Sequence, residues 1–166
     1  GKYKNTPNQI SGTDENGKDY LIFMPLAPYE TPLAIENLCD TYNKAIEEGT
    51  IDPLILIPIF IHDFLCIHPF RDGNGRMSRL LTTLLLYRSG YYVGKYISLE
   101  AKIASIKDLY YDALSESQDG WHEEKDDPTP FIKYMLSIVD MAYKDFESRV
   151  ALVTKNCYRS DTTISC

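Results

Sequence analysis

Hydrophobic residues recur at helical spacing along most of the chain, in five separate stretches. Residues 33–49 have apolar positions three to five residues apart, and residues 52–67 are apolar on almost every side. Three further helices are predicted at residues 77–89, 99–117 and 131–155. We expect residues 52–67 at the centre of the core, since a helix without a polar face is stable only when other elements surround it.

A weaker β signal lies near the N-terminus, in residues 8–24. Two short stretches that favour strands, residues 8–10 and 20–23, flank a segment rich in turn-forming residues. That segment holds Gly12, Asp14, Asn16 and Gly17. The sequence therefore predicts an all-α fold with one small β-hairpin, a polar loop at residues 118–130 and a frayed tail at residues 156–166.

Composition places the chain among single-domain globular proteins. It has 166 residues, of which 44% are hydrophobic and 25% charged, so a sizeable core can be buried. The longest apolar run, residues 53–61, is too short to span a bilayer. With 17 basic and 24 acidic residues the net charge is -7, which leaves no basic face for a nucleic-acid backbone. We expect a soluble protein that binds neither membrane nor nucleic acid.

The four cysteines, Cys39, Cys66, Cys157 and Cys166, are scattered without the spacing of a zinc site. The N-terminus has no charged segment followed by an apolar one, so it does not resemble a secretory signal. We therefore predict a reduced, cytoplasmic protein. His62 lies four residues before Cys66 and could face a metal with it, but further ligands are not evident and we interpret the pair as ordinary packing.

A polar loop between two apolar helices concentrates groups that bind phosphate. Residues 68–79 read His-Pro-Phe-Arg-Asp-Gly-Asn-Gly-Arg-Met-Ser-Arg. Gly73 and Gly75 can adopt backbone angles barred to other residues, so that consecutive N–H groups form an anion nest at the start of a helix. Arg76 and Arg79 are three positions apart and can bind phosphate oxygens with forked hydrogen bonds.

The same loop contains an acid–base group and a metal ligand. His68 has an ordinary pKa near neutrality and can accept a proton from an attacking hydroxyl. Asp72 is a hard oxygen ligand, and Mg²⁺ commonly needs only one or two carboxylates beside substrate phosphates. We expect Phe70 to point into the core and fix the loop. Each residue alone fits packing or a turn, but together beside buried helices they would be costly without an anionic ligand.

This stretch resembles the motif of the Fic (filamentation induced by cAMP) family, His-x-Phe-x-Asp/Glu-Gly-Asn-Gly-Arg-x-x-Arg, at every defined position. A chance match in a chain of this length has a probability on the order of 10⁻⁸. Residues 1–4 and 22–25 are similar to the segment that precedes the motif in this family, and residues 110–114 to one that follows it. The resemblance therefore extends over most of the chain.

The resemblance implies a catalytic core over residues 1–155, in which a flap hairpin at about residues 8–24 covers the active site. The implied activity is that of a protein adenylyltransferase, which moves AMP from Mg-ATP to a Ser, Thr or Tyr hydroxyl of another protein and releases pyrophosphate. The implied catalytic residues are His68 as base, Asp72 as Mg²⁺ ligand, Asn74 in the anion hole and Arg79 on the outer phosphates. The implied nucleotide- and phosphate-binding residues are Phe70, Arg71, Asp72, Gly73, Asn74, Gly75, Arg76, Arg79, Tyr110 and Tyr111.

Two of these assignments have simpler alternatives. The strand edge at Asn8, Gln9 and Ile10 can align an extended target segment by strand addition, or the hairpin can merely cover the core. Tyr110 and Tyr111 can be helix-face packing, or one of them can reach the nucleotide base.

Members of this family are often restrained by an inhibitory helix with the pattern Ser/Thr-x-x-x-Glu-Gly/Asn, whose glutamate pairs with the second motif arginine. Residues 11–16 fit that string, but their turn-forming residues favour a hairpin turn over a helix. We therefore expect an inhibitory helix outside this chain or on a separate chain, and interpret the chain as a fragment or as a member regulated in that way.

Two other classes of function stay open. The same site could use another nucleotide, phosphocholine or phosphate, or could remove AMP from a modified protein. Alternatively, the chain could be a module that binds nucleotide or a partner without turnover. The intact motif from Asp72 to Arg79 favours nucleotidyl transfer, and a positioned base at His68 argues against binding alone.

Overall fold

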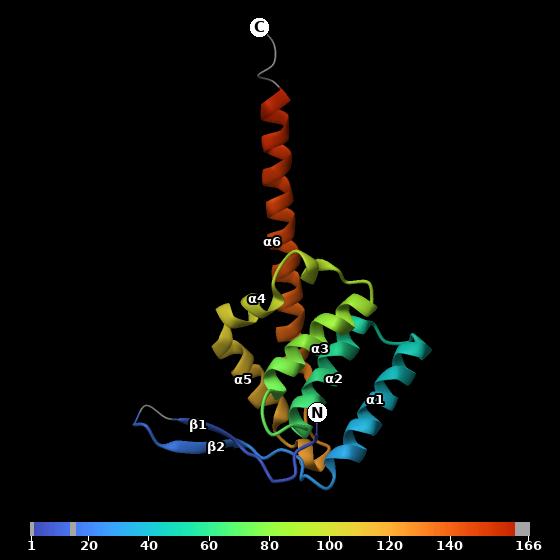
Figure 1. The fold of residues 1–166 in the computed structure, drawn as a ribbon, viewed down its shortest axis with the longest axis vertical. Coiled ribbons are helices and arrows are strands. Elements are labelled where there is room, and N and C mark those ends of the chain that lie inside the picture. The colour runs from blue at the N-terminus through green and yellow to red at the C-terminus, as the bar shows by residue number, and fades with distance from the viewer. Residues whose placement is uncertain (1, 14–15, 162–166) are drawn as a thin grey trace.

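The computed structural model describes residues 2–13 and 16–161, and most of these residues are helical (Figure 1). The helices are α1 (Thr31–Glu48), α2 (Pro53–Ile67), α3 (Asn74–Arg88), α4 (Leu99–Ser105), α5 (Lys107–Gln118) and α6 (Thr129–Asp161). Two short 3-10 helices, η1 (Val93–Lys95) and η2 (Trp121–Glu123), lie in the connections. The predicted all-α fold with a small β-hairpin is confirmed.

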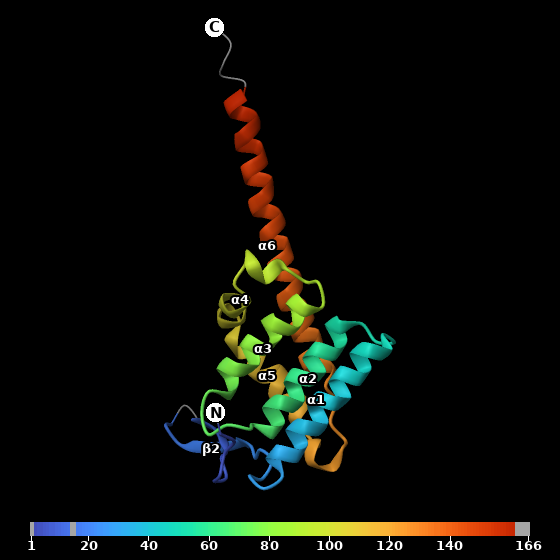
Figure 2. The same cartoon turned by 45° about the vertical axis from the view of Figure 1, so that its right-hand side comes forward.

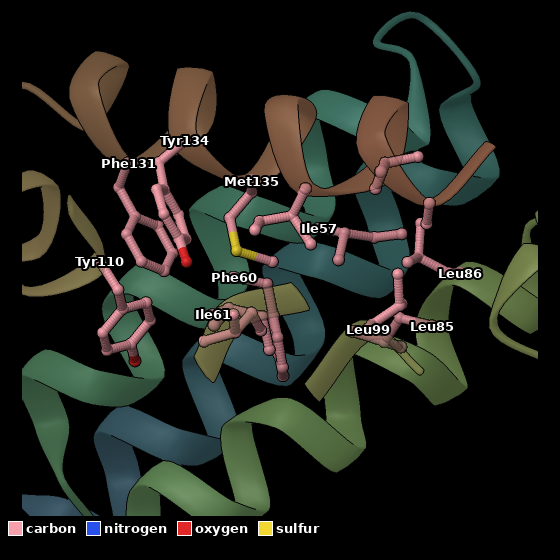
Figure 3. Close-up of a cluster of buried hydrophobic side chains, with 14 of the residues drawn as sticks. Ile57, Phe60, Ile61, Leu85, Leu86, Leu99, Tyr110, Phe131, Tyr134 and Met135 are labelled. Carbon is pink, nitrogen blue, oxygen red and sulfur yellow. The ribbon is translucent and has the colours of Figure 1, made fainter. Parts of the chain in front are cut away.

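Helix α2 lies at the centre of the core, as its apolar sequence predicts. It contacts α1, α3, α5 and α6. Its first turn is capped by the Asp52 side chain, which accepts a hydrogen bond of 2.8 Å from the Leu54 N–H. The buried cluster that α2 shares with α3, α4, α5 and α6 is drawn in Figure 3. It includes Ile57, Phe60, Ile61, Leu85, Leu86, Leu99, Tyr110, Phe131, Tyr134 and Met135.

Several helix boundaries differ from the expected ones. Helix α3 begins at Asn74 instead of Met77, because Gly73 takes a left-handed conformation and starts the helix three residues earlier. The stretch expected as one helix at residues 99–117 is divided at Ile106, whose backbone leaves the helical region. Helix α6 continues to Asp161, beyond the expected start of a frayed tail at residue 156, and residues 162–166 lie outside the described part.

The flap hairpin consists of β1 (Ile10–Thr13) and β2 (Asp19–Phe23), paired antiparallel with Gly12 opposite Tyr20. An irregularity in the pairing follows Ile10. The expected first strand at residues 8–10 is therefore misplaced, since Asn8 and Gln9 precede β1. Asp14 and Glu15 of the expected turn lie outside the described residues.

The N-terminal and C-terminal parts of the described chain lie at opposite ends of the bundle. Figures 1 and 2 show the flap hairpin at the end where α2 meets α3, and α6 extending beyond the other helices at the opposite end. Among the described residues, no helix has both the length and the apolar character needed to cross a membrane.

Candidate active site

The candidate site is built on the loop between α2 and α3. His68 ends α2 in a left-handed conformation with φ of 51°, and its N–H donates to the Phe64 carbonyl at 2.9 Å. Such a backbone is uncommon for a residue other than glycine and persists only where the surrounding structure holds it. The turn directs the chain from the buried helix into the motif loop.

The imidazole of His68 has a defined orientation. Its Nδ1 lies 3.1 Å from the Leu65 carbonyl oxygen, which can only accept, so Nδ1 carries the proton and Nε2 the lone pair. Burial lowers the pKa of His68, the hydrogen bond to Leu65 raises it, and the nearby Lys4 charge lowers it further. The balance favours a neutral imidazole that can accept a proton at Nε2.

Asn74 closes the motif loop from within. Its side chain is almost completely buried, accepts a hydrogen bond from the Phe70 N–H at 2.9 Å and donates one to the Phe70 carbonyl at 2.7 Å. The side chain of Asn74 is therefore bound to the backbone of the loop. What Asn74 offers to a ligand is its main-chain N–H in the first turn of α3.

The start of α3 has the features of an anion nest. Gly73 has a φ of 84° and its N–H donates to the Asp72 carboxylate at 2.7 Å. The N–H groups of residues 74–76 lie in the first turn, where a helix provides no carbonyl partners. Gly75 is helical, contrary to the expectation of an unusual backbone, and a β-carbon there would lie 3.5 Å from Nη1 of Arg79.

A pocket of about 650 Å³ joins the motif to the flap hairpin. His68, Gly75 and Arg79 line it from the motif, and residues 110–112 line it from α5. From the flap hairpin it is lined by Ile10, Ser11, Tyr20, Leu21 and Ile22, and Gln9, just before β1, lines it as well. His68, one motif arginine and the hairpin therefore surround one space.

The two motif arginines do not share this pocket. Arg79 lines it and donates from Nε to a Glu100 carboxylate oxygen at 3.1 Å. Arg76 instead pairs with Asp72 at 3.3 Å, and both line a second hollow of about 790 Å³ with Phe70 and Arg71. The expected site is thus spread over two neighbouring hollows around the N-terminus of α3.

The remaining predicted residues divide between packing and exposure. Phe70 packs beside Phe64 and Tyr3, with ring centroids 6.4 and 6.1 Å apart. Tyr110 belongs to the core, where burial raises its pKa to about 12. Tyr111 is half exposed and lines the pocket beside it. Of the two tyrosines, Tyr111 has the surface that a nucleotide base could contact.

The N-terminal segment anchors the motif loop, a role that the sequence did not reveal. Asn8, expected to dock targets, donates from Nδ2 to the carbonyls of His68 and Phe70 at 3.4 and 3.1 Å. Lys4 is buried and donates from Nζ to the Ile67 carbonyl at 2.9 Å and to the Asn8 amide oxygen at 3.0 Å. Burial lowers the pKa of Lys4 to about 8. Polar residues before a strand carry no pattern that announces such contacts.

Comparison with known proteins places these features in a family. Residues 1–86, more than half of the chain, match the model of the Fic/DOC family. A Fido domain-containing protein of Dictyostelium discoideum is 29% identical over 128 residues, which are 75% of this chain and 85% of that protein. The protein adenylyltransferase fic-1 of Caenorhabditis briggsae is 38% identical over 71 residues, 42% of this chain but only 13% of the relative.

Solved structures of Fic family proteins resemble this chain as well. A Fic family protein of Desulfovibrio desulfuricans has a TM-score of 0.67 and 28% identity, over 89% of this chain and 41% of its own. A Fic domain-containing signalling protein of Bacteroides thetaiotaomicron has a TM-score of 0.62 and 28% identity, over 86% of this chain and 54% of its own. With the intact motif, the helical core and the flap hairpin, these matches show that the chain belongs to the Fic/DOC family.

Proposed function

We propose that this chain transfers AMP from ATP to a hydroxyl group of another protein. In the reaction, the hydroxyl oxygen forms a bond to the α-phosphorus while the bond from that phosphorus to the bridging oxygen of pyrophosphate breaks. The hydroxyl proton passes to Nε2 of His68. The similarity to a named protein adenylyltransferase supports this reaction at the level of the family.

The orientation of His68 is the observation that carries the proposal. Its Nδ1–H is held by the Leu65 carbonyl, which leaves Nε2 basic in a pocket shared with Arg79 and the flap hairpin. A module that only binds nucleotide needs no such base. A lowered pKa of His68 keeps the imidazole in the form that accepts a proton at neutral pH.

Phosphate binding would involve the start of α3. The first-turn N–H groups of residues 74–76 and the positive end of the helix dipole favour an anion there. Arg79 would bind an outer phosphate after exchanging its contact with Glu100, whose side chain is 69% exposed and free to turn away. Arg76 would neutralise charge from the adjoining hollow.

Asp72 suits a magnesium ion that accompanies the nucleotide. Its side chain is 91% exposed at the edge of the nest, and its ion pair with Arg76 is exposed and weak. A carboxylate oxygen beside phosphate oxygens is the ligand set that Mg²⁺ prefers. When bound, Mg²⁺ would stabilise the charge that develops on the leaving pyrophosphate.

The flap hairpin would hold the target segment. β1 is paired with β2 on one side, and Ile10 and Ser11 line the pocket that contains His68. An extended segment added to the other edge of β1 would bring its hydroxyl toward the pocket. Because Asn8 is bound to the motif loop, Gln9 and Ile10 are the better candidates for target contact.

The test is incubation with ATP labelled at either the α- or the γ-phosphate, together with Mg²⁺ and a cell lysate as the source of acceptors. We expect protein labelling from the α-label alone. His68→Ala should reduce the transfer rate by about 10²–10⁴-fold, the usual contribution of a general base, while ATP still binds. Transfer of the γ-label would mean phosphate transfer, and equal labelling by His68→Ala would refute the assigned base.

A further inference from the structure

A second cluster of ligand-bearing side chains lies outside the motif, on the α1 side of α2. His62 and Asp63 come from α2, and Asp126 comes from the connection between α5 and α6. One ligand atom of each lies within 4.8 Å of the others. The site opens toward a hollow of about 800 Å³ that Asp63, Asp126 and Trp121 help to line.

The tautomer of His62 follows from its surroundings. The side chain is 1% exposed, and Nε2 lies 3.0 Å from the carbonyl oxygen of Ser117. A carbonyl can only accept, so Nε2 carries the proton. In the neutral ring Nδ1 then holds a lone pair, and the polar atoms beside it are oxygens of Asp63 at 3.3 Å and of Asp126 at 3.9 Å.

That arrangement is unfavourable without a positive charge between the three groups. Nδ1 and the Asp63 oxygen lie at hydrogen-bonding distance, but with the proton on Nε2 of a neutral ring both atoms are acceptors, so only a further proton or a metal ion makes the contact favourable. A second ring proton would satisfy it, but a charge-assisted N–H···O bond closes to about 2.7–2.9 Å. Neither observed distance is that short. The 3.3 Å to Asp63 matches the roughly 3.0–3.5 Å between neighbouring ligands of one metal ion, and the 3.9 Å to Asp126 would shorten when an ion binds.

We propose that His62 Nδ1, Asp63 and Asp126 bind a divalent transition-metal ion, with zinc as the first choice. An imidazole nitrogen suits zinc better than Mg²⁺ or Ca²⁺, which prefer oxygen ligands throughout. The hydrogen bond from Nε2 to the Ser117 carbonyl is the support that metal-binding histidines usually have. Water from the adjoining hollow would complete the coordination shell.

Cys66 is not a ligand of this site. Its sulfur lies 3.7 Å from Nε2 of His62, the protonated nitrogen, and not beside Nδ1. Burial raises the pKa of the Cys66 thiol, while a hydrogen bond from Gln118 lowers it, and the net shift keeps the thiol protonated. The interpretation as packing therefore fits Cys66, whereas the carboxylates of Asp63 and Asp126 are the groups that face Nδ1 of His62.

The ion would connect α2 to the base of the flap hairpin. Trp121 donates from Nε1 to the Asp63 carboxylate at 3.1 Å, and the next residue, His122, lies 2.7 Å from the Met24 carbonyl through Nε2. Phe23, the last residue of β2, contacts both rings, with centroids 6.3 and 5.6 Å away. Fixing Asp126 against α2 would thus order the loop on which the hairpin rests.

Trp121 is the single tryptophan of the chain and reports directly on the site. The experiment is a Zn²⁺ titration of the metal-free full chain without nucleotide, followed by tryptophan fluorescence and by the thermal midpoint. We expect a saturable fluorescence change at one ion per chain and a higher Tm with zinc, since a ligand that binds only the folded state stabilises it. Zinc bound by distant thiols would leave the emission of Trp121 unchanged.

The matched variants are Asp126→Asn and Glu123→Gln. Asp126→Asn removes one ligand charge at a partly exposed position and should weaken zinc binding at least about tenfold. Glu123→Gln changes the same charge in the same loop, where the side chain is exposed, and should bind zinc like the unchanged chain. Absence of a saturable fluorescence change, or equal affinity in Asp126→Asn, would overturn the proposal in favour of an ordinary buried hydrogen-bond cluster.

Discussion

Partial burial of His68 determines the pH range in which it can act as a base. Desolvation disfavours the charged imidazole, so its pKa lies below the ordinary value, and the neutral form persists to lower pH than in an exposed histidine. Activity should therefore be retained as pH falls toward 6.5 and be lost only below it. We expect the acid limb of the kcat/KM profile for AMP transfer below about 6.5.

Two controls accompany this profile. Circular dichroism over the same pH range establishes where the chain is folded, and ATP binding at each pH separates nucleotide affinity from catalysis. A limb above 6.5 would mean that a neighbouring negative charge, and not burial, controls His68.

The ion pair between Arg79 and Glu100 competes with any phosphate that Arg79 would bind. The Glu100 side chain is exposed, so the pair contributes little, about 0.2–1 kcal/mol. Glu100→Gln should lower the Kd for ATP by up to about fivefold, measured by isothermal titration calorimetry. Asp108→Asn removes an acidic residue from the first turn of α5 and serves as a matched control that should leave the Kd unchanged.

The sequence predicts neither Glu100 as the partner of Arg79 nor Asp126 as the partner of His62. Glu100 lies 21 residues after Arg79, and Asp126 lies 64 residues after His62, so both pairings depend on how helices pack. The motif residues were predictable because their chemistry is local, within one loop. Exposed acidic residues at the start of a helix are common, and the neighbouring sequence does not distinguish Glu100 from Asp108.

The N-terminal segment acts as a strap across the motif loop. The Lys4 main-chain N–H donates a hydrogen bond of 2.8 Å to the Pro69 carbonyl. The Asn8 side chain donates hydrogen bonds to the carbonyls of His68 and Phe70. Asn8→Ala should lose up to three hydrogen bonds, the two donated to these carbonyls and the one accepted from Lys4 Nζ, at about 0.5–1.5 kcal/mol each. Because these carbonyls belong to the motif loop that carries His68, the proposed base, kcat should fall while the Kd for ATP changes little.

Asn5→Ala is the matched control for Asn8→Ala, since Asn5 is exposed in the same segment. Its Tm and kcat should equal those of the unchanged chain. If Asn8→Ala lowered Tm but left kcat intact, the strap would stabilise the fold without positioning His68.

Helix existence was easier to predict than helix ends. The apolar stretch of α2 indicated a central helix correctly, because a helix apolar on every side must be surrounded. The break at Ile106 has no glycine or proline to announce it, and it arises where α4 and α5 each pack on other elements. The early start of α3 depends on the left-handed Gly73 and on the contact of Asn74 with Phe70, which helical periodicity does not encode.

The candidate site lies at one end of the helical bundle, and the C-terminal part of α6 projects from the opposite end. α2 carries the core along its length and His68 at its terminus, so packing of α3, α5 and α6 on α2 also fixes the motif loop. α6 is buried at Phe131, Ile138 and Ala142, and Phe146 is its last core contact among the residues whose side chains the structure describes. Beyond that residue it extends away from the other helices (Figure 1), and residues 150–154 are exposed.

This division predicts how much of α6 the site requires. A chain that ends at Arg149 keeps the core contacts of α6 and the ion pair of Lys102 with Asp145 at 2.7 Å. Its Tm, measured by differential scanning calorimetry, should stay within about 2 °C of the full chain, because surface changes usually alter stability by no more than about 0.5 kcal/mol. Its Kd for ATP should be unchanged.

The contrasting variant ends at Asp140 and loses Ala142, Tyr143 and Phe146 from the core. Each large buried side chain that is lost lowers the free energy of unfolding by a few kcal/mol. The combined loss is comparable with the whole free energy of unfolding of a domain, so this chain should melt at a much lower temperature or fail to fold. A large drop in Tm already at Arg149 would contradict the division, since it would mean that the projecting turns of α6 are covered in solution and contribute to stability themselves.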